Sequence, residues 1–194
     1  MERHLLQPTI KIICQYVKRF EENTNAFETD KAISKLIGAF PLNTSVDEIL
    51  LKVAAIDRLY STNVYAIYLM AQHILELNID ANLSEHDPEI VMRIAELQIQ
   101  GKIRHFYSFA TKYCSWHNQN SYPIYDSYVD KLLRAYRKRD SFAEYSNEEL
   151  YDYPCFRKII QKFQSFYELE QFSLRDLDKF LWLYGKEYSV GVSN

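Results

Sequence analysis

Glycine and proline are scarce in this chain, with four and five residues among 194. Segments in which apolar and polar residues alternate, as in half-buried strands, are also rare, so we find no convincing strand and favour helices with short connections. No apolar run approaches membrane-spanning length, and the first four residues, Met1–His4, lack the hydrophobic stretch of a signal peptide. We therefore expect a cytoplasmic protein with no membrane partner.

Several motifs that carry chemistry are absent. There is no glycine-rich nucleotide loop of the GxGxxG or Walker A type, so no nucleotide cofactor is expected. No GxSxG element or serine–histidine–aspartate triad is marked either. The three cysteines, Cys14, Cys114 and Cys155, are scattered, as is typical of reduced thiols in the cytosol. His105, His117 and Cys114 do not match a zinc-binding spacing, and we expect neither a metal nor another cofactor.

What the chain does contain is apolar and aromatic. Apolar residues make up 47% of the sequence, which argues against disorder, and 16 tyrosines and 11 phenylalanines dominate the aromatics. Because so many tyrosine hydroxyls cannot all be buried without partners, several should line a groove or a surface. The net charge is −3, unlike the basic excess of a general nucleic-acid binder.

Helical periodicity and capping residues predict about nine helices in one all-α unit spanning residues 1–194. Ser45 with Glu48 and Ser173 with Asp176 have the spacing of capping boxes, Asn63 is a candidate N-cap, and Gly185 a candidate C-terminal stop. The predicted segments are 8–22, 29–39, 45–59, 64–77, 87–98, 103–116, 126–139, a short turn at 146–149, 152–167 and 173–185.

The segment Tyr122-Pro123-Ile124-Tyr125-Asp126 is the most informative stretch. It reads as a proline-closed turn with Asp126 at the mouth of an amphipathic helix. The free N–H groups and the dipole of a helix N-terminus stabilise an ionised carboxylate there. Such a carboxylate can simply cap the helix, or it can face a cation that forms during a reaction, and both interpretations remain open.

The helix after Asp126 becomes strongly basic. A run of cations can be a solvated helix face, or it can bind phosphates. The cations in this run are Lys131, Arg134, Arg137, Lys138 and Arg139.

Two segments together resemble the helix-hairpin-helix DNA glycosylase superfamily. The first, residues 59–64, is a polar turn between two apolar helices, similar to an early turn in that superfamily. The second, Pro123-Ile124-Tyr125-Asp126, resembles the segment whose aspartate is the catalytic carboxylate. The resemblance covers roughly residues 45–140, with 1–44 and 141–194 as helical elaborations packed on this core.

The resemblance implies a monofunctional DNA glycosylase, which hydrolyses the N-glycosidic bond of a damaged or modified base. The hairpin stretch near Arg104 lacks the family's glycines, which leaves the phosphate contact to side chains, and Tyr107 stands where bifunctional members carry a lysine. Asp126 would be catalytic. The base pocket and wedge would include Tyr60, Ser61, Tyr107, Tyr113, Trp116 and Tyr125, and the DNA contacts Thr62, Lys112, Lys131, Arg134, Arg137 and Lys138.

The proposed chemistry has a physical basis in Asp126 itself. Breaking an N-glycosidic bond builds positive charge on the sugar, which a fixed carboxylate stabilises. The base must leave the duplex first, and aromatic side chains can stack on it. The substrate would be either an endogenous lesion, as in repair, or a modified base of phage DNA, for example a glucosylated one. The alternative is a helical module that retains the fold and binds DNA or protein without catalysis. We expect a monomer.

Overall fold

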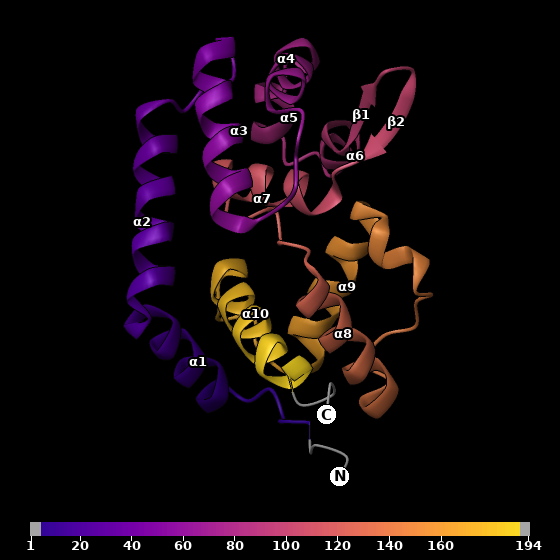
Figure 1. Cartoon of the computed structure of the whole chain (residues 1–194). Coiled ribbons are helices and arrows are strands. Elements are labelled where there is room, and N and C mark those ends of the chain that lie inside the picture. Colours follow the sequence, from indigo (N-terminus) through magenta and orange to yellow (C-terminus); the bar gives the residue numbers. More distant parts are fainter. Residues whose placement is uncertain (1–4, 191–194) are drawn as a thin grey trace. The chain divides into compact units, whose positions relative to one another are not determined.

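Helices account for nearly all regular structure in the computed structural model, which describes residues 5–190 (Figure 1). The all-α fold class predicted from the sequence is confirmed. Met1–His4, where the sequence lacks a signal-peptide stretch, lie outside the described residues. The helices are α1 (Ile10–Glu22), α2 (Thr24–Ala39), α3 (Val46–Tyr60), α4 (Ile67–Leu77), α5 (Asp80–Ser84), α6 (Glu89–Ala95), α7 (Tyr107–His117), α8 (Ser127–Asp140), the 3-10 helix η1 (Glu148–Tyr151), α9 (Tyr153–Phe166) and α10 (Leu174–Val190).

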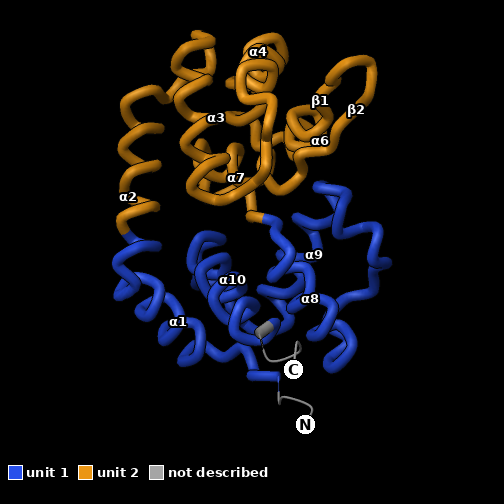
Figure 2. Tube along the Cα trace, viewed as in Figure 1, with its two compact units in different colours: residues 1–27, 125–194 blue, residues 28–124 orange. Residues whose placement is uncertain are grey.

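The chain divides into two compact units, coloured separately in Figure 2. Unit 1 combines residues 1–27 with 125–194, and unit 2 is the continuous segment 28–124. One division falls inside α2 and the other directly before Tyr125. The prediction of a single domain with a core at 45–140 stays a prediction.

Unit 2 is built on α3, α4, α6 and α7, which pack on one another. Apolar residues at helical spacing supply its core: Ile49, Val53 and Ile56 of α3 are fully buried, as are Met70 of α4 and Phe109 of α7. Burying side chains of this size is the main source of stability for such a helical unit.

A buried lysine ties the loop before α3 to this core. Lys52 Nζ donates to two backbone carbonyls of residues 40–42, at 3.1 and 2.7 Å, and to Asn43 Oδ1 at 2.8 Å. Tyr113 donates its hydroxyl to the same Asn43 oxygen at 2.6 Å, and the Asn43 side-chain amide donates to Asp80 at 2.7 Å. Every donor of the ammonium group thus has an acceptor, which offsets the cost of burying its charge.

Unit 1 packs α10 between α1 and α8, and its core is rich in aromatics. Tyr136 of α8 meets Phe163 of α9 edge to face, with ring centroids 5.3 Å apart, and Tyr16 of α1 meets Phe180 of α10 at 5.4 Å. The Tyr136 hydroxyl donates to the carbonyl of Leu6 at 2.9 Å. Aromatic pairs in this geometry stabilise beyond their buried area, and the hydroxyls find partners.

A β-hairpin corrects two predicted helix boundaries and the expectation of no strand. Strands β1 (Glu96–Ile99) and β2 (Lys102–His105) pair antiparallel, with Ile99 opposite Lys102. Gln100 and Gly101 form the connection with φ of 49° and 76°, the left-handed pair that suits a tight hairpin turn. The 87–98 helix therefore ends at Ala95, and the 103–116 helix begins at Tyr107.

One predicted cap, Asn63, is wrong, and a second, Ser45, is the N-cap of α3 as predicted but lacks the side-chain bond of a capping box. Helix α4 begins at Ile67 and not at residue 64, because Asn63 has a left-handed φ of 60°. Asp57 organises this turn: its Oδ1 accepts from the Val64 backbone N–H at 2.7 Å. Ser45 precedes α3 but makes no side-chain capping bond; its hydroxyl donates to Asp47 instead.

At the C-terminal end, Gly185 does not stop the last helix, since α10 continues to Val190. A Cβ atom placed on Gly185 would stand 2.8 Å from the carbonyl oxygen of Tyr128. The glycine therefore allows α10 to approach the first turn of α8 closely. The Ser173–Asp176 capping box is confirmed, with the Asp176 backbone N–H donating to the Ser173 hydroxyl at 3.1 Å.

Candidate functional site

Asp126 is the N-cap of α8, as predicted. Its Oδ1 accepts hydrogen bonds from the backbone N–H groups of Tyr128 and Val129, at 2.8 and 3.0 Å. None of the described residues donates to the second oxygen, Oδ2. The side chain is partly buried, so the carboxylate is fixed at one oxygen and keeps the other for a further interaction.

Tyr125, predicted to lie in a base pocket, is packed inside unit 1. Its ring meets Phe156 of α9 at a centroid distance of 5.5 Å and Tyr151 of η1 at the same distance. Its hydroxyl donates to Asp130 Oδ1 at 3.3 Å. Burial raises the pKa of the Tyr125 hydroxyl far above its ordinary range, and the hydrogen bond with Tyr151 is the second-largest cause of the rise. These contacts hold the residue that precedes Asp126 in place.

The arginines of α8 are engaged within unit 1. Arg134 makes two hydrogen bonds to the Asp130 carboxylate, Nε at 2.8 Å and Nη2 at 2.9 Å. Arg137 donates to the carbonyl of Tyr145 and, at 2.8 Å, to Asn147 Oδ1, and its guanidinium lies 4.5 Å from the Tyr145 ring centroid. Hydrogen bonds of this kind fix the guanidinium groups. A DNA phosphate would therefore have to bind arginines that already bond other residues of unit 1.

Lys131 and Lys138 differ from those arginines. Both are exposed on α8, and neither has an ion-pair or hydrogen-bond partner among the described residues. Of the basic run, these two lysines are the side chains most available to a phosphate. Arg139, by contrast, pairs with Asp140 at 2.6 Å.

In unit 2, three of the predicted residues meet. Trp116 of α7 donates its indole N–H to the Tyr60 hydroxyl at 3.1 Å, and Tyr60 donates to Asp30 at 3.0 Å. The Lys112 ammonium lies 5.9 Å from the centroid of the Tyr60 ring and donates to Ser108 Oγ at 2.7 Å. Lys112 is buried, at 5% exposure. A desolvated ammonium against an aromatic face interacts more strongly than an exposed one.

The other predicted residues of unit 2 have structural surroundings. Ser61 ends α3 in a left-handed conformation, and the Thr62 hydroxyl donates to Asp57 at 2.8 Å. Tyr113 is fully buried in the Asn43 network, and burial raises the pKa of its hydroxyl well above the ordinary value. Tyr107 is partly buried at the first turn of α7. Their predicted roles in a pocket or wedge stay predictions.

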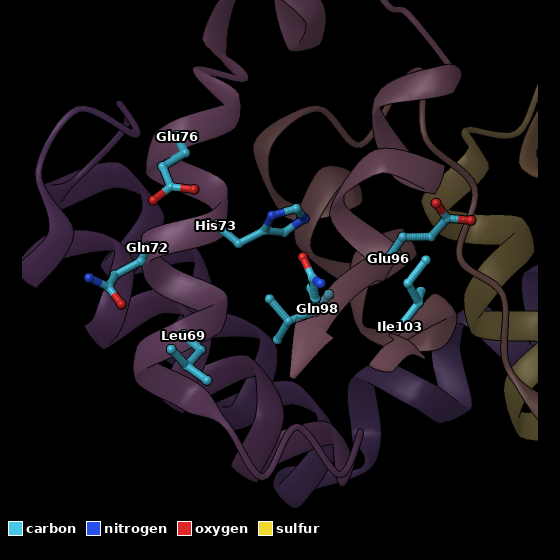
Figure 3. A pocket seen from close by; sticks show the side chains of 8 residues that line it. Leu69, Gln72, His73, Glu76, Glu96, Gln98 and Ile103 are labelled. Carbon is cyan, nitrogen blue, oxygen red and sulfur yellow. The ribbon is translucent and has the colours of Figure 1, made fainter. Parts of the chain in front are cut away.

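A cleft of about 450 Å³ separates α4 from the β-hairpin in unit 2 (Figure 3). His73 is fixed in it by a hydrogen bond between Nε2 and the carbonyl of Arg93, at 2.8 Å. The described lining residues include two carboxylates and no lysine or arginine, so the cleft does not suit a phosphate. They are Leu69, Gln72, His73, Glu76, Glu96, Leu97, Gln98 and Ile103. Sequence reasoning missed it because the hairpin was predicted as helix; the Gln100-Gly101 pair between short apolar runs was the available signal.

Within residues 5–190 there is no group of three or more histidine, cysteine or acidic side chains that could hold a metal ion. Cys14, Cys114 and Cys155 are free thiols, and burial raises the pKa of Cys114 far above its usual value. No helix in the described part of the chain is long and apolar enough to cross a bilayer.

A family model, HI_0787_N, described as an N-terminal domain, matches residues 12–121. The chain belongs to the HI_0787_N family. A relative from Haemophilus influenzae, named only as an uncharacterized protein, is 40% identical over 146 residues, which are 75% of this chain and 70% of the relative. No solved structure matches. The segment matched to the HI_0787_N family includes Tyr60, Lys112 and Trp116 and ends before Asp126.

Proposed function

We propose that this protein is a monofunctional DNA glycosylase that acts in the cytoplasm on double-stranded DNA. It hydrolyses the N-glycosidic bond of a damaged or modified base and leaves an abasic site. Asp126 is the catalytic carboxylate. The proposal extends the resemblance to helix-hairpin-helix glycosylases. One observation supports it: Oδ1 of Asp126 caps the helix, while Oδ2 accepts no hydrogen bond from the described residues.

The capping and catalytic interpretations of Asp126 are compatible in this geometry. Oδ1 takes both backbone N–H groups of the first turn of α8, at 2.8 and 3.0 Å, so capping uses one oxygen. The N-terminal dipole of α8 and these two donors interact favourably with the negative charge of the carboxylate. Oδ2 is then a fixed negative charge that can stabilise an oxocarbenium-like sugar or orient the attacking water.

Two substrate classes fit this reaction. One is an endogenous lesion, which would make the protein a repair enzyme. The other is a modified base in phage DNA, such as a glucosylated one, which would make it a defence enzyme. In either case the target nucleotide has to leave the duplex before its glycosidic bond is reached. Tyr60 and Trp116 are the side chains of unit 2 that we would test for binding a base, and Lys112, which lies against the Tyr60 ring, is one that we would test for a DNA contact.

The test is base release by wild type and by Asp126→Asn. Asparagine caps a helix about as well as aspartate, so this change removes the charge and keeps the cap. Both proteins would be incubated with unmodified DNA, with DNA carrying oxidised, alkylated or deaminated bases, and with glucosylated phage DNA. Alkali-labile abasic sites would then be counted. We expect sites from the wild type on one class of DNA and none from Asp126→Asn.

Asp152 supplies a matched control. It caps α9, which has 14 residues like α8, and its carboxylate accepts a hydrogen bond from the Cys155 backbone N–H at 2.9 Å. Asp152→Asn should release bases at the wild-type rate. If folded wild type makes no abasic sites on any DNA, the glycosylase proposal fails and the non-catalytic binding module takes its place. Equal activity of Asp126→Asn and wild type would reject Asp126 as the catalytic group.

A further inference from the structure

Regular secondary structure forms both walls of the cleft between α4 and the β-hairpin. On the hairpin wall, Gln98 of β1 stands opposite Ile103 of β2, and Glu96 shares their face because it lies two positions before Gln98. On the other wall, four residues of α4 follow the spacing i, i+3, i+4 and i+7, so they lie on one face of the helix. They are Leu69, Gln72, His73 and Glu76. Both walls belong to unit 2, which fixes the positions of these side chains.

The described lining of this cleft carries negative charge without positive charge. Glu76 stands on the α4 wall and Glu96 on the hairpin wall. Glu76 has no ion-pair or hydrogen-bond partner among residues 5–190, and Glu96 has one ion pair there, with His105 Nδ1 at 3.9 Å. A cleft of similar size in unit 1, of about 410 Å³, differs because Lys11 and Glu168 both line it. The cleft beside α4 therefore complements a cation.

His73 adds a neutral acceptor between the two carboxylates, as Figure 3 shows. Its Nε2 lies 2.8 Å from the carbonyl oxygen of Arg93, which can only accept a hydrogen bond, so Nε2 carries the proton. In the neutral ring, Nδ1 is then an acceptor, and no described residue bonds to it. Gln72 and Gln98 add amide oxygens to the lining. The cleft thus offers several acceptors to a ligand that donates hydrogen bonds.

Apolar side chains complete the lining. Leu69 and Ile103 are 43% and 60% exposed, so methylene groups of a ligand that cover them would leave water together with them. The lining does not suit a metal ion, since no three metal-ligating side chains cluster anywhere in residues 5–190. The ligand that fits has ammonium groups joined by an aliphatic chain.

We propose that the cleft between α4 and the β-hairpin binds an aliphatic diamine or polyamine. One ammonium group donates to the Glu76 carboxylate and a second to Glu96, while the methylene chain lies against Leu69 and Ile103. The volume of about 450 Å³ is within the range of small-ligand pockets. This binding goes beyond the proposed function and does not depend on it, because no lining residue of the cleft has a role in base release.

The test is binding of putrescine and spermidine to the full-length protein, measured by isothermal titration calorimetry at constant ionic strength. We expect both to bind with one molecule per chain. Glu76→Gln and Glu96→Gln should each weaken binding by about threefold, and the two changes together by about tenfold, as expected for partly exposed ion pairs. Butylamine has the same carbon chain as putrescine but one ammonium group, so it should bind about threefold more weakly.

Glu144→Gln with Glu170→Gln is the matched control. It removes two exposed carboxylates from unit 1 that have no partner among the described residues, so the change in net charge is the same. This variant should keep the wild-type affinity. Because all four glutamates are exposed, neither double variant should change the melting temperature without ligand.

Three outcomes would overturn the inference. They are folded wild type that binds neither putrescine nor spermidine, wild-type affinity in the double variant of the cleft, and an equal loss of affinity in the control. Magnesium chloride that competes with putrescine at equal concentration would also overturn it, since attraction to diffuse charge would then explain the binding. Each of these outcomes leaves base release unaffected, whereas the proposed function fails on the absence of abasic sites.

Discussion

The indole N–H of Trp116 donates to the hydroxyl of Tyr60 at 3.1 Å, across 56 positions of the sequence. Tyr60 in turn donates to Asp30 at 3.0 Å, so one hydroxyl accepts from α7 and donates to α2. A tyrosine hydroxyl can do both at once. This chain of hydrogen bonds holds the C-terminal end of α3 against two other helices of unit 2.

Breaking this contact should show coupling between the two residues. Trp116→Phe should lower the free energy of unfolding by about 1 kcal/mol, and Tyr60→Phe by about 2 kcal/mol, because the Tyr60 hydroxyl makes two partly buried hydrogen bonds. The bond between Trp116 and Tyr60 is lost in both variants. Because they share that bond, the double variant should lose less than the sum, by roughly 0.5–1 kcal/mol. Urea denaturation followed by circular dichroism measures all four proteins. Strictly additive losses would mean that the bond contributes nothing to stability. As a control, Tyr65→Phe at an exposed site should leave the free energy of unfolding unchanged.

Removing the cap of α8 should destabilise the fold separately from any effect on catalysis. Asp126→Ala should lower the unfolding free energy by about 1 kcal/mol, since two backbone N–H groups lose their acceptor. Asp126→Asn should be close to wild type in stability. Thermal melts of both variants, with Asp152→Ala as the equivalent change at α9, check this. A loss in Asp126→Asn as large as that in Asp126→Ala would show that charge, and not capping, stabilises α8.

Gly185 and Gly38 should respond oppositely to alanine. At Gly185 a Cβ would meet the backbone of Tyr128 at 2.8 Å, and forcing the two helices apart should cost about 1–3 kcal/mol. At Gly38, inside α2, nothing lies within 4 Å of the added atom, so alanine should stabilise by roughly 0.5–1 kcal/mol. Melting temperatures of the two variants should therefore move in opposite directions. A harmless Gly185→Ala would contradict the close approach of α10 to α8.

His117 should make stability depend on pH. Burial, reinforced by the charge of Lys52, lowers the pKa of its imidazole to about 4, and Nε2 has no hydrogen-bond partner among the residues that the structure describes. The unfolded chain, with a pKa near 6.5, binds more protons between about pH 4 and 6.5. Stability from this group is therefore complete above pH 6.5 and is lost as the pH falls toward 4, by roughly 3 kcal/mol at most.

The measurement for His117 is urea denaturation at several pH values, for wild type and His117→Phe. The phenylalanine keeps a ring beside Tyr113, whose centroid lies 5.1 Å from the imidazole. Other groups that titrate in both proteins cancel in the difference between them. The unfolding free energy of the wild type minus that of His117→Phe should fall as the pH is lowered from 6.5 to 4. A constant difference would mean that His117 has the same pKa in the folded and the unfolded protein.

The helical elements were predictable because their signals are local. Asp126, Asp152 and the Ser173–Asp176 pair mark helix starts in the sequence, and each caps a helix in the structure. The turn at Gln100-Gly101 also had a local signal, but the flanking strands are too short for their periodicity to be separated from helix. Gly185 was misread because glycine serves both as a helix stop and as a site of close packing, and only the neighbour decides between them.

The sequence by itself determined the all-α class, the helix starts and the position of Asp126 at the mouth of α8, since these depend on residues within one or two turns. Tertiary structure alone decided which cations are available. Arg137 and Arg139 look no different in sequence from Lys131 and Lys138, yet Arg137 is engaged by Asn147 and the Tyr145 carbonyl, and Arg139 by Gln7 and the Leu5 carbonyl. The physical reason is that a charged side chain acts on a ligand only with the donors that the fold leaves unused, and partners distant in sequence make that choice.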